Sequence, residues 1–356
     1  PSSSASRRAD SSRRIVQGDQ QPNRSAPRHE LDAYEPASDR VLAAVGVGRF
    51  GHEIVAHLVA DLVEESSSLV NVTPIPGLRV IGVDSDENPW IQTRSPIQRA
   101  FRSLGRIANR MHLAPDVSWI SKAVRPSGLS EEFDGLELCF IVSPLNDPFN
   151  QRELPDLFRA LDARGTKTIA LLSLPEDWEL SFTAPATMEC LTQILTTRAS
   201  VITVPISSIG IPDEDLTWED HLREVTRYFS SGFGTLLRAS SWIEGATNVS
   251  LSDIFGVLVP GHRGALGFSE VSGVDKSLRI HQLIDEADGR LRRQEVYLVK
   301  ASQVLAILSG ARSFTRSEVR ELMAELQRRC GDGTSILFGT SRINAQSNEV
   351  QLTLVV

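Results

Sequence analysis

The stretch Val41-Leu-Ala-Ala-Val-Gly46-Val-Gly48-Arg-Phe-Gly51 is an apolar strand pattern that runs into three glycines. Residues 52–63 follow with apolar positions at helical spacing, so the glycines lie where a strand passes into a helix. At such a junction, backbone N–H groups and the positive end of the helix point at one place, which suits a phosphate group. The glycines have G-x-G-x-x-G spacing, a motif that fits dinucleotide enzymes, other nucleotide binders, and folds in which glycine only turns the chain.

Apolar strand patterns alternate with helical patterns from residue 41 to residue 205, which is typical of a mainly parallel α/β sheet. The predicted strands are 41–47, 78–84, 137–143, 167–173 and 200–205. The predicted helices between them lie near 51–64, 95–111, 151–163 and 186–197, and a longer helix runs from about 218 to 243. Residues 248–356 have a different order, with strands at 254–259, 295–300, 334–340 and 349–356 and helices near 275–287 and 315–328. The polar turn 344–348 between the last two strands indicates a hairpin.

These patterns divide the chain into four segments. Residues 1–38 are rich in Ser, Arg and Pro and are expected to form a disordered arm. A nucleotide-binding sheet domain is predicted over 39–216, a central helix and linker over 217–247, and an α+β domain over 248–356. The arm contains the pairs Arg7-Arg8 and Arg13-Arg14, but no apolar stretch follows them, so an export signal is not expected.

Composition limits the classes of protein to consider. The chain has 356 residues and a net charge of −8, so a general nucleic-acid-binding surface is not expected. Its three cysteines lie far apart, with no C-x-x-C pair, which predicts reduced thiols and neither a zinc site nor a disulfide framework. The apolar runs are short, so no transmembrane segment is predicted. A cytoplasmic location is therefore expected.

The position of the first acidic strand end distinguishes between nucleotide folds. A nicotinamide-binding unit places an acidic residue about 20 residues after the glycines. Here Asp84, at the end of the second predicted strand, lies 33 residues after Gly51. An NAD(P)-dependent oxidoreductase is thus disfavoured, and a P-loop NTPase is disfavoured further, because no Gly-Lys-Ser/Thr follows the turn.

The arrangement instead resembles the tubulin/FtsZ superfamily, as a divergent bacterial or archaeal FtsZ-like chain, over residues 41–356. In the first half the matching stretches are Gly46-Val-Gly48, Val80-Ile-Gly-Val-Asp84-Ser-Asp86, Thr168-Ile-Ala-Leu-Leu-Ser-Leu-Pro175 and Ala199-Ser-Val-Ile-Thr-Val-Pro205. In the second half they are Asn248-Val-Ser-Leu-Ser-Asp253, which resembles the synergy loop, Gly264-Ala-Leu-Gly267, Ile336-Leu-Phe-Gly339 and Val350-Gln-Leu-Thr-Leu354. The resemblance implies a Rossmann-like parallel-sheet GTPase domain, a central linking helix and a C-terminal α+β domain.

The resemblance also implies a set of functional residues. In the family, a guanine nucleotide lies on the loops of one subunit, and the synergy loop of the next subunit supplies carboxylates for hydrolysis. Carried over, the nucleotide-binding residues are Gly46, Gly48, Gly51, Asp84 and Asp86. The interface residues are Asn248, Ser250 and Asp253, with Asp253 as the catalytic carboxylate acting in trans. No metal ligand set is predicted beyond Mg²⁺ that would accompany the nucleotide.

This chain departs from the family at the places that bind phosphate. The fourth loop, rich in glycine in the family, reads Ser143-Pro-Leu-Asn-Asp147-Pro-Phe-Asn150 here. Its prolines remove N–H donors, and Asp147 places a negative charge where a phosphate would lie. Arg49 and Phe50 crowd the first loop, and Ser250 replaces the first acidic residue of the synergy loop. Hydrolysis is therefore expected to be impaired.

Residues 95–111 combine an apolar helix face with arginines on the other faces. The simpler interpretation is a solvated face of a packed helix. The alternative is a candidate contact for an anion or an acidic partner, made by Arg99, Arg102, Arg106 and Arg110.

The leading hypothesis from the sequence is an FtsZ-like cytoskeletal filament or scaffold protein with a degenerate nucleotide site. It would associate with itself or with an FtsZ-like homologue, bind GTP or GDP only if the site is retained, and use the N-terminal arm for a protein partner, because the chain ends directly after the last strand. An active GTP-hydrolysing FtsZ paralogue is the alternative, and an NAD(P)-dependent oxidoreductase is the third hypothesis.

Overall fold

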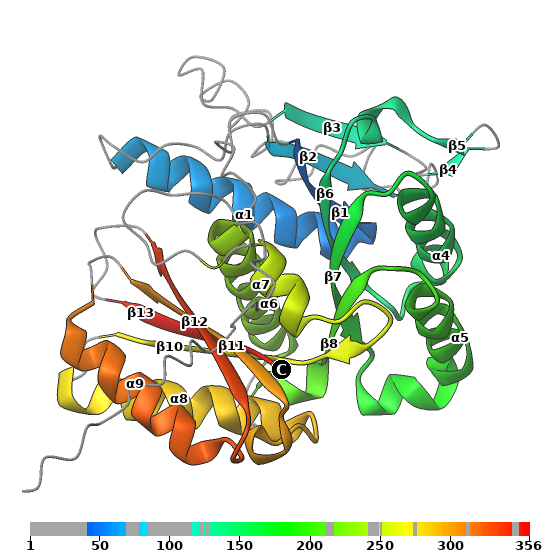
Figure 1. Ribbon diagram of the computed structural model, residues 1–356. Helices are drawn as coiled ribbons and strands as arrows, with labels where there is room; N and C mark the ends of the chain where they lie inside the picture. Colours follow the sequence, from blue (N-terminus) through cyan, green and yellow to red (C-terminus); the bar gives the residue numbers. More distant parts are fainter. Residues whose placement is uncertain are drawn as a thin grey trace, which may run out of the picture. The chain divides into compact units, whose positions relative to one another are not determined.

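The computed structural model describes residues 41–68, 78–84, 116–120, 124–125, 128–210, 217–240, 249, 251–272, 276–310, 314–343 and 349–356. All of them belong to one compact unit, residues 37–356. The unit contains two large sheets with a long helix between them (Figure 1). No helix in the described ranges has an apolar stretch long enough to cross a lipid bilayer.

The larger sheet is parallel and has the order β3-β2-β1-β6-β7-β8-β9. Its strands are β1 (Leu42–Val47), β2 (Leu78–Val83), β3 (Asp116–Ile120), β6 (Leu138–Pro144), β7 (Lys167–Leu174), β8 (Ser200–Pro205) and β9 (Arg263–Gly264). A small antiparallel pair, β4 (Val124–Arg125) and β5 (Gly128–Leu129), precedes β6. The chain adds strands outward from β1 to β3 and then returns to the other side of β1 with β6. In open α/β sheets, ligands bind at the carboxyl ends of the strands where the strand order reverses. In this sheet, that place is at the ends of β1 and β6.

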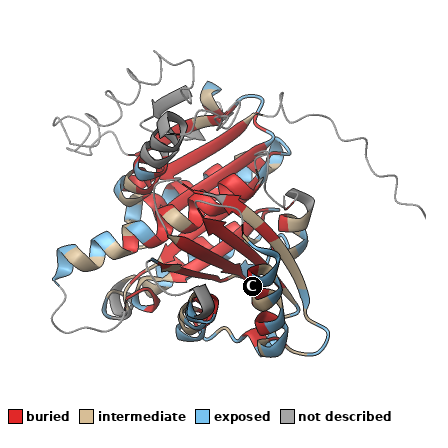
Figure 2. Ribbon diagram, turned by 90° about the vertical axis from the view of Figure 1, so that its left-hand side faces the viewer, coloured by how far each residue is buried: buried red, intermediate tan, exposed pale blue. Residues whose placement is uncertain are grey.

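Alternating side chains of the parallel strands enter two different cores, as the two-residue period of a strand requires. Leu42 and Ala44 face α1 (Gly48–Ser68), whereas Ala43 and Val45 face the opposite side of the sheet. The opposite side is covered by α4 (Pro148–Ala163) and α5 (Asp177–Leu195). Figure 2 shows the central strands as buried, while the exposed residues lie on outer helix faces and in turns.

Helix α6 (Trp218–Ser240) is the central linking helix that the sequence predicts. Its apolar residues belong to the same core as α1 and as strands of both sheets: Val225, Tyr228, Phe229, Phe233, Leu236 and Leu237. Tyr228 packs edge-on against Phe268 of the smaller sheet, with ring centroids 5.8 Å apart. The two sheets therefore share a continuous apolar core through α6.

The smaller sheet is mixed, with the order β10-β13-β11-β12. Its strands are β10 (Leu266–Val271), β11 (Gln303–Gly310), β12 (Ser335–Arg342) and β13 (Val350–Val355). Helices α8 (Lys276–Arg293) and α9 (Arg316–Arg329) share a core with its outer face, and α6 packs on its inner face. This α+β arrangement confirms the predicted fold class.

The first half confirms all five predicted strands, but three helices begin earlier than predicted. Helix α1 starts at Gly48, α4 at Pro148 and α5 at Asp177, nine residues before the predicted start at 186. For α5, the reason is a capping box in which Glu176 and Glu179 satisfy each other's backbone N–H groups. The predicted helix 95–111 lies outside the described residues.

Three predictions for the second half were wrong. Residues 254–259 are not a strand, since α7 (Leu251–Val257) is a helix that buries Ile254, and the buried Leu258 directly follows it. Residues 295–300 form a turn and the short 3₁₀ helix η4 (Leu298–Lys300), and the strand follows at β11. The last two strands are not a hairpin, because β12 and β13 pair with opposite sides of the apolar strand β11.

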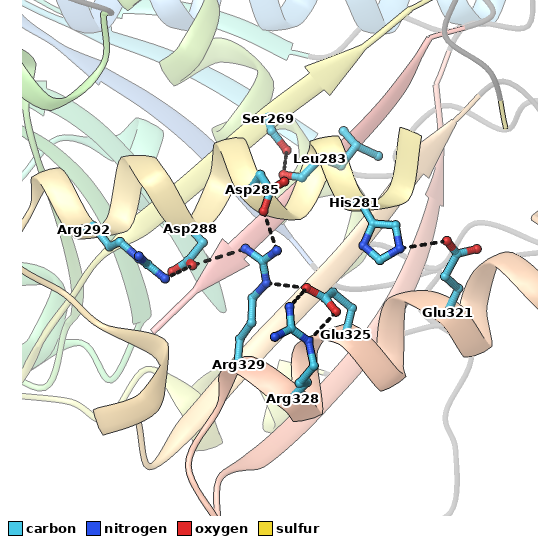
Figure 3. A network of polar contacts seen from close by, with 10 residues as sticks. All are labelled: Ser269, His281, Leu283, Asp285, Asp288, Arg292, Glu321, Glu325, Arg328 and Arg329. Carbon is cyan, nitrogen blue, oxygen red and sulfur yellow. Dashed lines mark hydrogen bonds and ion pairs between the residues drawn. The ribbon is translucent and has the colours of Figure 1, made fainter. Parts of the chain in front are cut away.

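A network of charged side chains holds α9 against α8 (Figure 3). Arg329, mostly buried, contacts Asp285, Asp288 and Glu325. Arg328 also binds Glu325, and the hydrogen bonds from these two arginines lower the pKa of that carboxyl group to about 2. The network places α9 with one face inward and leaves the opposite face exposed.

We expect Glu325→Gln to flatten the loss of stability in acid. The carboxyl group has a folded pKa of about 2 against an ordinary 4.5, so its contribution is present above about pH 4.5 and is lost as the pH falls toward 2. Urea unfolding between pH 7 and pH 2 should show a less stable variant at neutral pH whose unfolding free energy falls less steeply below pH 5. If the unfolding free energies of the wild type and the variant fall equally steeply with pH, this role of Glu325 is contradicted.

Candidate functional site

As the sequence predicts, the glycine turn lies where a strand passes into a helix, at the carboxyl end of β1. The strand order of the sheet reverses at the same place. A Cβ atom on Gly46 would lie 2.4 Å from the carbonyl oxygen of Gly51, and one on Gly51 would lie 2.5 Å from the carbonyl oxygen of Val142. Both distances are too short for any side chain. These two glycines are required because α1 packs directly on β1 and β6, whether or not a ligand binds.

Gly48 is required for a different reason. Its φ is +69°, which favours glycine, and it faces the carboxamide of Asn150. A Cβ atom here would lie 2.5 Å from Asn150 Nδ2. Asn150 is fully buried, and its Nδ2 donates a hydrogen bond of 3.0 Å to the carbonyl oxygen of Pro144. The side chain of Asn150 therefore covers the turn on the side of the fourth loop.

The amino end of α4 also points at this place, and it is capped by its own carboxylate. Asp147 is the N-cap, and its Oδ1 accepts a hydrogen bond of 2.7 Å from the backbone N–H of Phe149. Pro148, at the first helical position, has no N–H to offer. The positive end of α4, which attracts anions, thus already holds a negative charge supplied by the chain.

Asp84 lies at the end of β2, as predicted, but it is buried beside His52 of α1. Only 5% of Asp84 is exposed, and its Oδ2 lies 3.8 Å from His52 Nδ1. Burial lowers the pKa of His52 to about 3, although backbone hydrogen bonds to Val83 and Gly46 act in the opposite direction. The imidazole is therefore neutral at physiological pH and ties the glycine turn to the end of β2.

A second polar cluster follows the same edge of the sheet, at the ends of β6 and β7. Asn146 donates hydrogen bonds of 3.3 Å to both carboxylate oxygens of Glu179 at the start of α5. Glu176, which precedes that helix, lies 2.9 Å from His221 Nε2 on α6. This cluster joins the loops after β6 and β7 to the first turns of α5 and α6.

Sequence reasoning missed Asn150, Glu176 and His221 as residues of this edge. The spacing Glu176-x-x-Glu179 is a capping-box signal that could have been found in the sequence. Glu176 and His221 are 45 residues apart in the sequence, so no local sequence pattern predicts their contact.

The remaining predicted site residues are not brought together in the structure. Asp253 lies in the first turn of α7 and is half-buried. Seven others lie outside the described residues: Asp86, Arg99, Arg102, Arg106, Arg110, Asn248 and Ser250.

The order of the strands, the linking helix α6 and the mixed second sheet form a tubulin-like fold. The fold of the chain is similar to that of solved FtsZ and CetZ structures. It shares 16% identity with an empty FtsZ dimer from M. jannaschii, with a TM-score of 0.67 over 89% of this chain and 87% of that one. A GTPγS-bound CetZ2 protofilament from Haloferax volcanii has 12% identity and a TM-score of 0.60 over 89% and 92% of the two chains.

CetZ from Methanosaeta thermophila gives 14% identity and a TM-score of 0.61, with 89% of this chain and 86% of that chain covered. No protein-family model matches the sequence. At such low sequence identity, the structural similarity establishes the fold alone. The chemistry has to be argued from this chain's own residues.

We expect Gly51→Ala to destabilise the protein by about 1–3 kcal/mol, as overpacking of a close contact typically does. The cause is the 2.5 Å approach of the new methyl group to the Val142 carbonyl oxygen. Gly256→Ala in α7 is the matched control, because no atom lies within 4 Å of its Cβ position and alanine favours the helix. Urea unfolding without nucleotide measures both variants. Equal stability of the two would show that the glycine turn is not required by packing.

Proposed function

We propose that this protein is an FtsZ-like cytoskeletal filament or scaffold protein whose GTP-type site has degenerated. The fold supports the first part, since neighbouring structures include an FtsZ dimer and a CetZ protofilament. The second part is supported by one observation, which is that Asp147 caps α4 and Asn150 of the same helix packs against Gly48 of the glycine turn.

Binding a triphosphate beside Asp147 would carry a large electrostatic cost. Two negative charges 4 Å apart near a protein surface repel by about 4 kcal/mol, and a triphosphate would meet the carboxylate of Asp147 where the family supplies glycine N–H groups. Asn150 adds a steric cost, because it already packs on Gly48. Neither resident nucleotide nor resident Mg²⁺ is therefore proposed.

Subunit association would then proceed without a hydrolysis cycle. The catalytic carboxylate in trans would come from Asp253 alone, since Ser250 stands at the other acidic position. We propose that the partner is a second copy or an FtsZ-like homologue, and that the arm 1–38 contacts a further protein. The three cysteines are free and buried, which accords with the reducing conditions of the cytoplasm.

An active GTPase with altered loops is the second candidate. The observation in its favour is that the similar CetZ2 structure is bound to GTPγS and that this chain keeps the Gly46–Gly51 turn. Packing accounts for Gly46 and Gly51 without a nucleotide, which favours the first candidate.

Nucleotide analysis of the purified full chain, combined with pelleting, tests the proposal. We expect no guanine nucleotide in the denatured protein and equal sedimentation with and without GTP and Mg²⁺. Strict dependence of pelleting on GTP would contradict the proposal. Turnover of GTP that rises with protein concentration and disappears in Asp253→Ala would establish the second candidate.

A further inference from the structure

The smaller sheet ends at β12, and the outer edge of this strand pairs with no other strand in the described part of the chain. β12 pairs with β11 over its whole length, from Ser335 to Arg342. A charged residue, a proline or a bulge commonly protects such an edge from further pairing. The register with β11 contains no bulge, and residues 335–341 contain neither a charge nor a proline. The edge of β12 is therefore able to accept a further strand.

Two hydrogen bonds show which backbone groups of β12 face outward. The N–H of Ser335 donates to the carbonyl oxygen of Ser302 at 3.0 Å, and directly after β12 the N–H of Ile343 donates to the end of β11 at 3.2 Å. Successive residues of a strand direct their N–H and C=O groups to opposite sides. The odd-numbered residues of β12 thus face β11, and Ile336 and Phe338 direct their backbone groups away from it.

The central side chains of β12 are apolar and only half-buried. Leu337 packs partly against the core around α6, on one face of the sheet. Ile336 and Phe338 pack partly against the core that α8 and α9 share with the other face. Aromatic and β-branched residues stabilise a sheet when they stand opposite each other on neighbouring strands. A strand added to this edge would therefore cover apolar surface on both faces.

The sequence of this edge is complementary to itself. When two copies of β12 run antiparallel with Leu337 opposite Leu337, each Ile336 stands opposite Phe338 of the other copy. The turn before β12 carries the acidic residue Asp332, and the last residue of the strand is the basic Arg342. Antiparallel pairing brings these opposite charges together at both ends, whereas parallel pairing would bring like charges together. The charge pattern thus favours a second copy in antiparallel orientation as the partner.

We propose that two copies of this protein pair through β12, so that their four-stranded sheets form one continuous sheet about a two-fold axis at Leu337. Ile336 of each copy exchanges backbone hydrogen bonds with Phe338 of the other, about four in all, because residues of a hydrogen-bonded antiparallel pair exchange both bonds. The contact is isologous and closes on itself. It therefore yields a dimer by itself and does not rest on the proposed filament.

A cysteine on the two-fold axis tests the contact. Leu337 forms a non-hydrogen-bonded pair with itself, so the two Cα atoms should lie about 4.5 Å apart, within the range for a disulfide. Ser335→Cys is the matched control on the same face of the strand. Its two Cα atoms should lie about 14 Å apart, at about 3.4 Å per residue, which is too far for a disulfide. The wild type is the second control, since its three cysteines are buried.

We expect mild oxidation of the full chain without nucleotide to give a covalent dimer as the main product of Leu337→Cys. Ser335→Cys and the wild type should stay monomeric on the same denaturing gel. The gel detects only covalent dimers, so filaments formed through other surfaces do not affect the result. If Leu337→Cys gives no more covalent dimer than Ser335→Cys, the contact is wrong.

A pair of charge variants tests the two-fold axis without a disulfide. Leu337→Lys and Leu337→Glu should each dimerise about tenfold more weakly than the wild type in sedimentation velocity, because like charges meet at the axis. An equimolar mixture of the two should recover the dimer, since lysine then faces glutamate. Val299→Lys, at a valine that is 62% exposed and outside β12, should dimerise like the wild type. Circular dichroism checks that each variant folds, and a mixture no more dimeric than its components would overturn the proposal.

Discussion

The close packing of α1 on β1 and β6 is the constraint on which the architecture of the site depends. Backbone meets backbone where Gly51 lies against the Val142 carbonyl and Gly46 lies against Gly51, so neither position admits a side chain. This contact fixes where the helix begins and how its first turn faces the sheet. It also accounts for Gly46 and Gly51 by packing alone, whether or not the turn binds a nucleotide.

The proposed loss of the nucleotide site is supported by several groups around the turn. An anion site at helix termini needs free N–H groups and an uncompensated positive helix end. At α4, Asp147 binds the Phe149 N–H and places a negative charge at the positive end of the helix, and Pro148 has no N–H. Asn150 lies against Gly48. Neutral His52 and buried Asp84 tie the turn to β2 without adding a positive charge. This edge of the sheet thus carries the carboxylates of Asp147, Glu176 and Glu179, which supports the proposed loss of the nucleotide.

Sequence patterns predicted the parallel strands well, because buried parallel strands are short apolar runs bounded by turn residues, as in Ile169–Leu172 and Val201–Val204. They failed at α7, where Ile254-Phe-Gly-Val257 has β-branched residues but packs as a helix. They also failed at the final hairpin, because strand order depends on β11 being central. The role of Asp147 as a charge near the fourth loop was visible in the sequence. The position of Asn150 on Gly48 was not, since it depends on how α4 meets α1.

Thermal unfolding of the wild-type chain with millimolar GTP and Mg²⁺ tests the central claim, that the chain's own groups occupy the phosphate position. A ligand that binds the folded state at a concentration 100 times its dissociation constant stabilises a protein by about 2.7 kcal/mol. The account predicts an unfolding midpoint that is the same with GTP, with GDP and without nucleotide. A midpoint that rises with GTP concentration and saturates would contradict it.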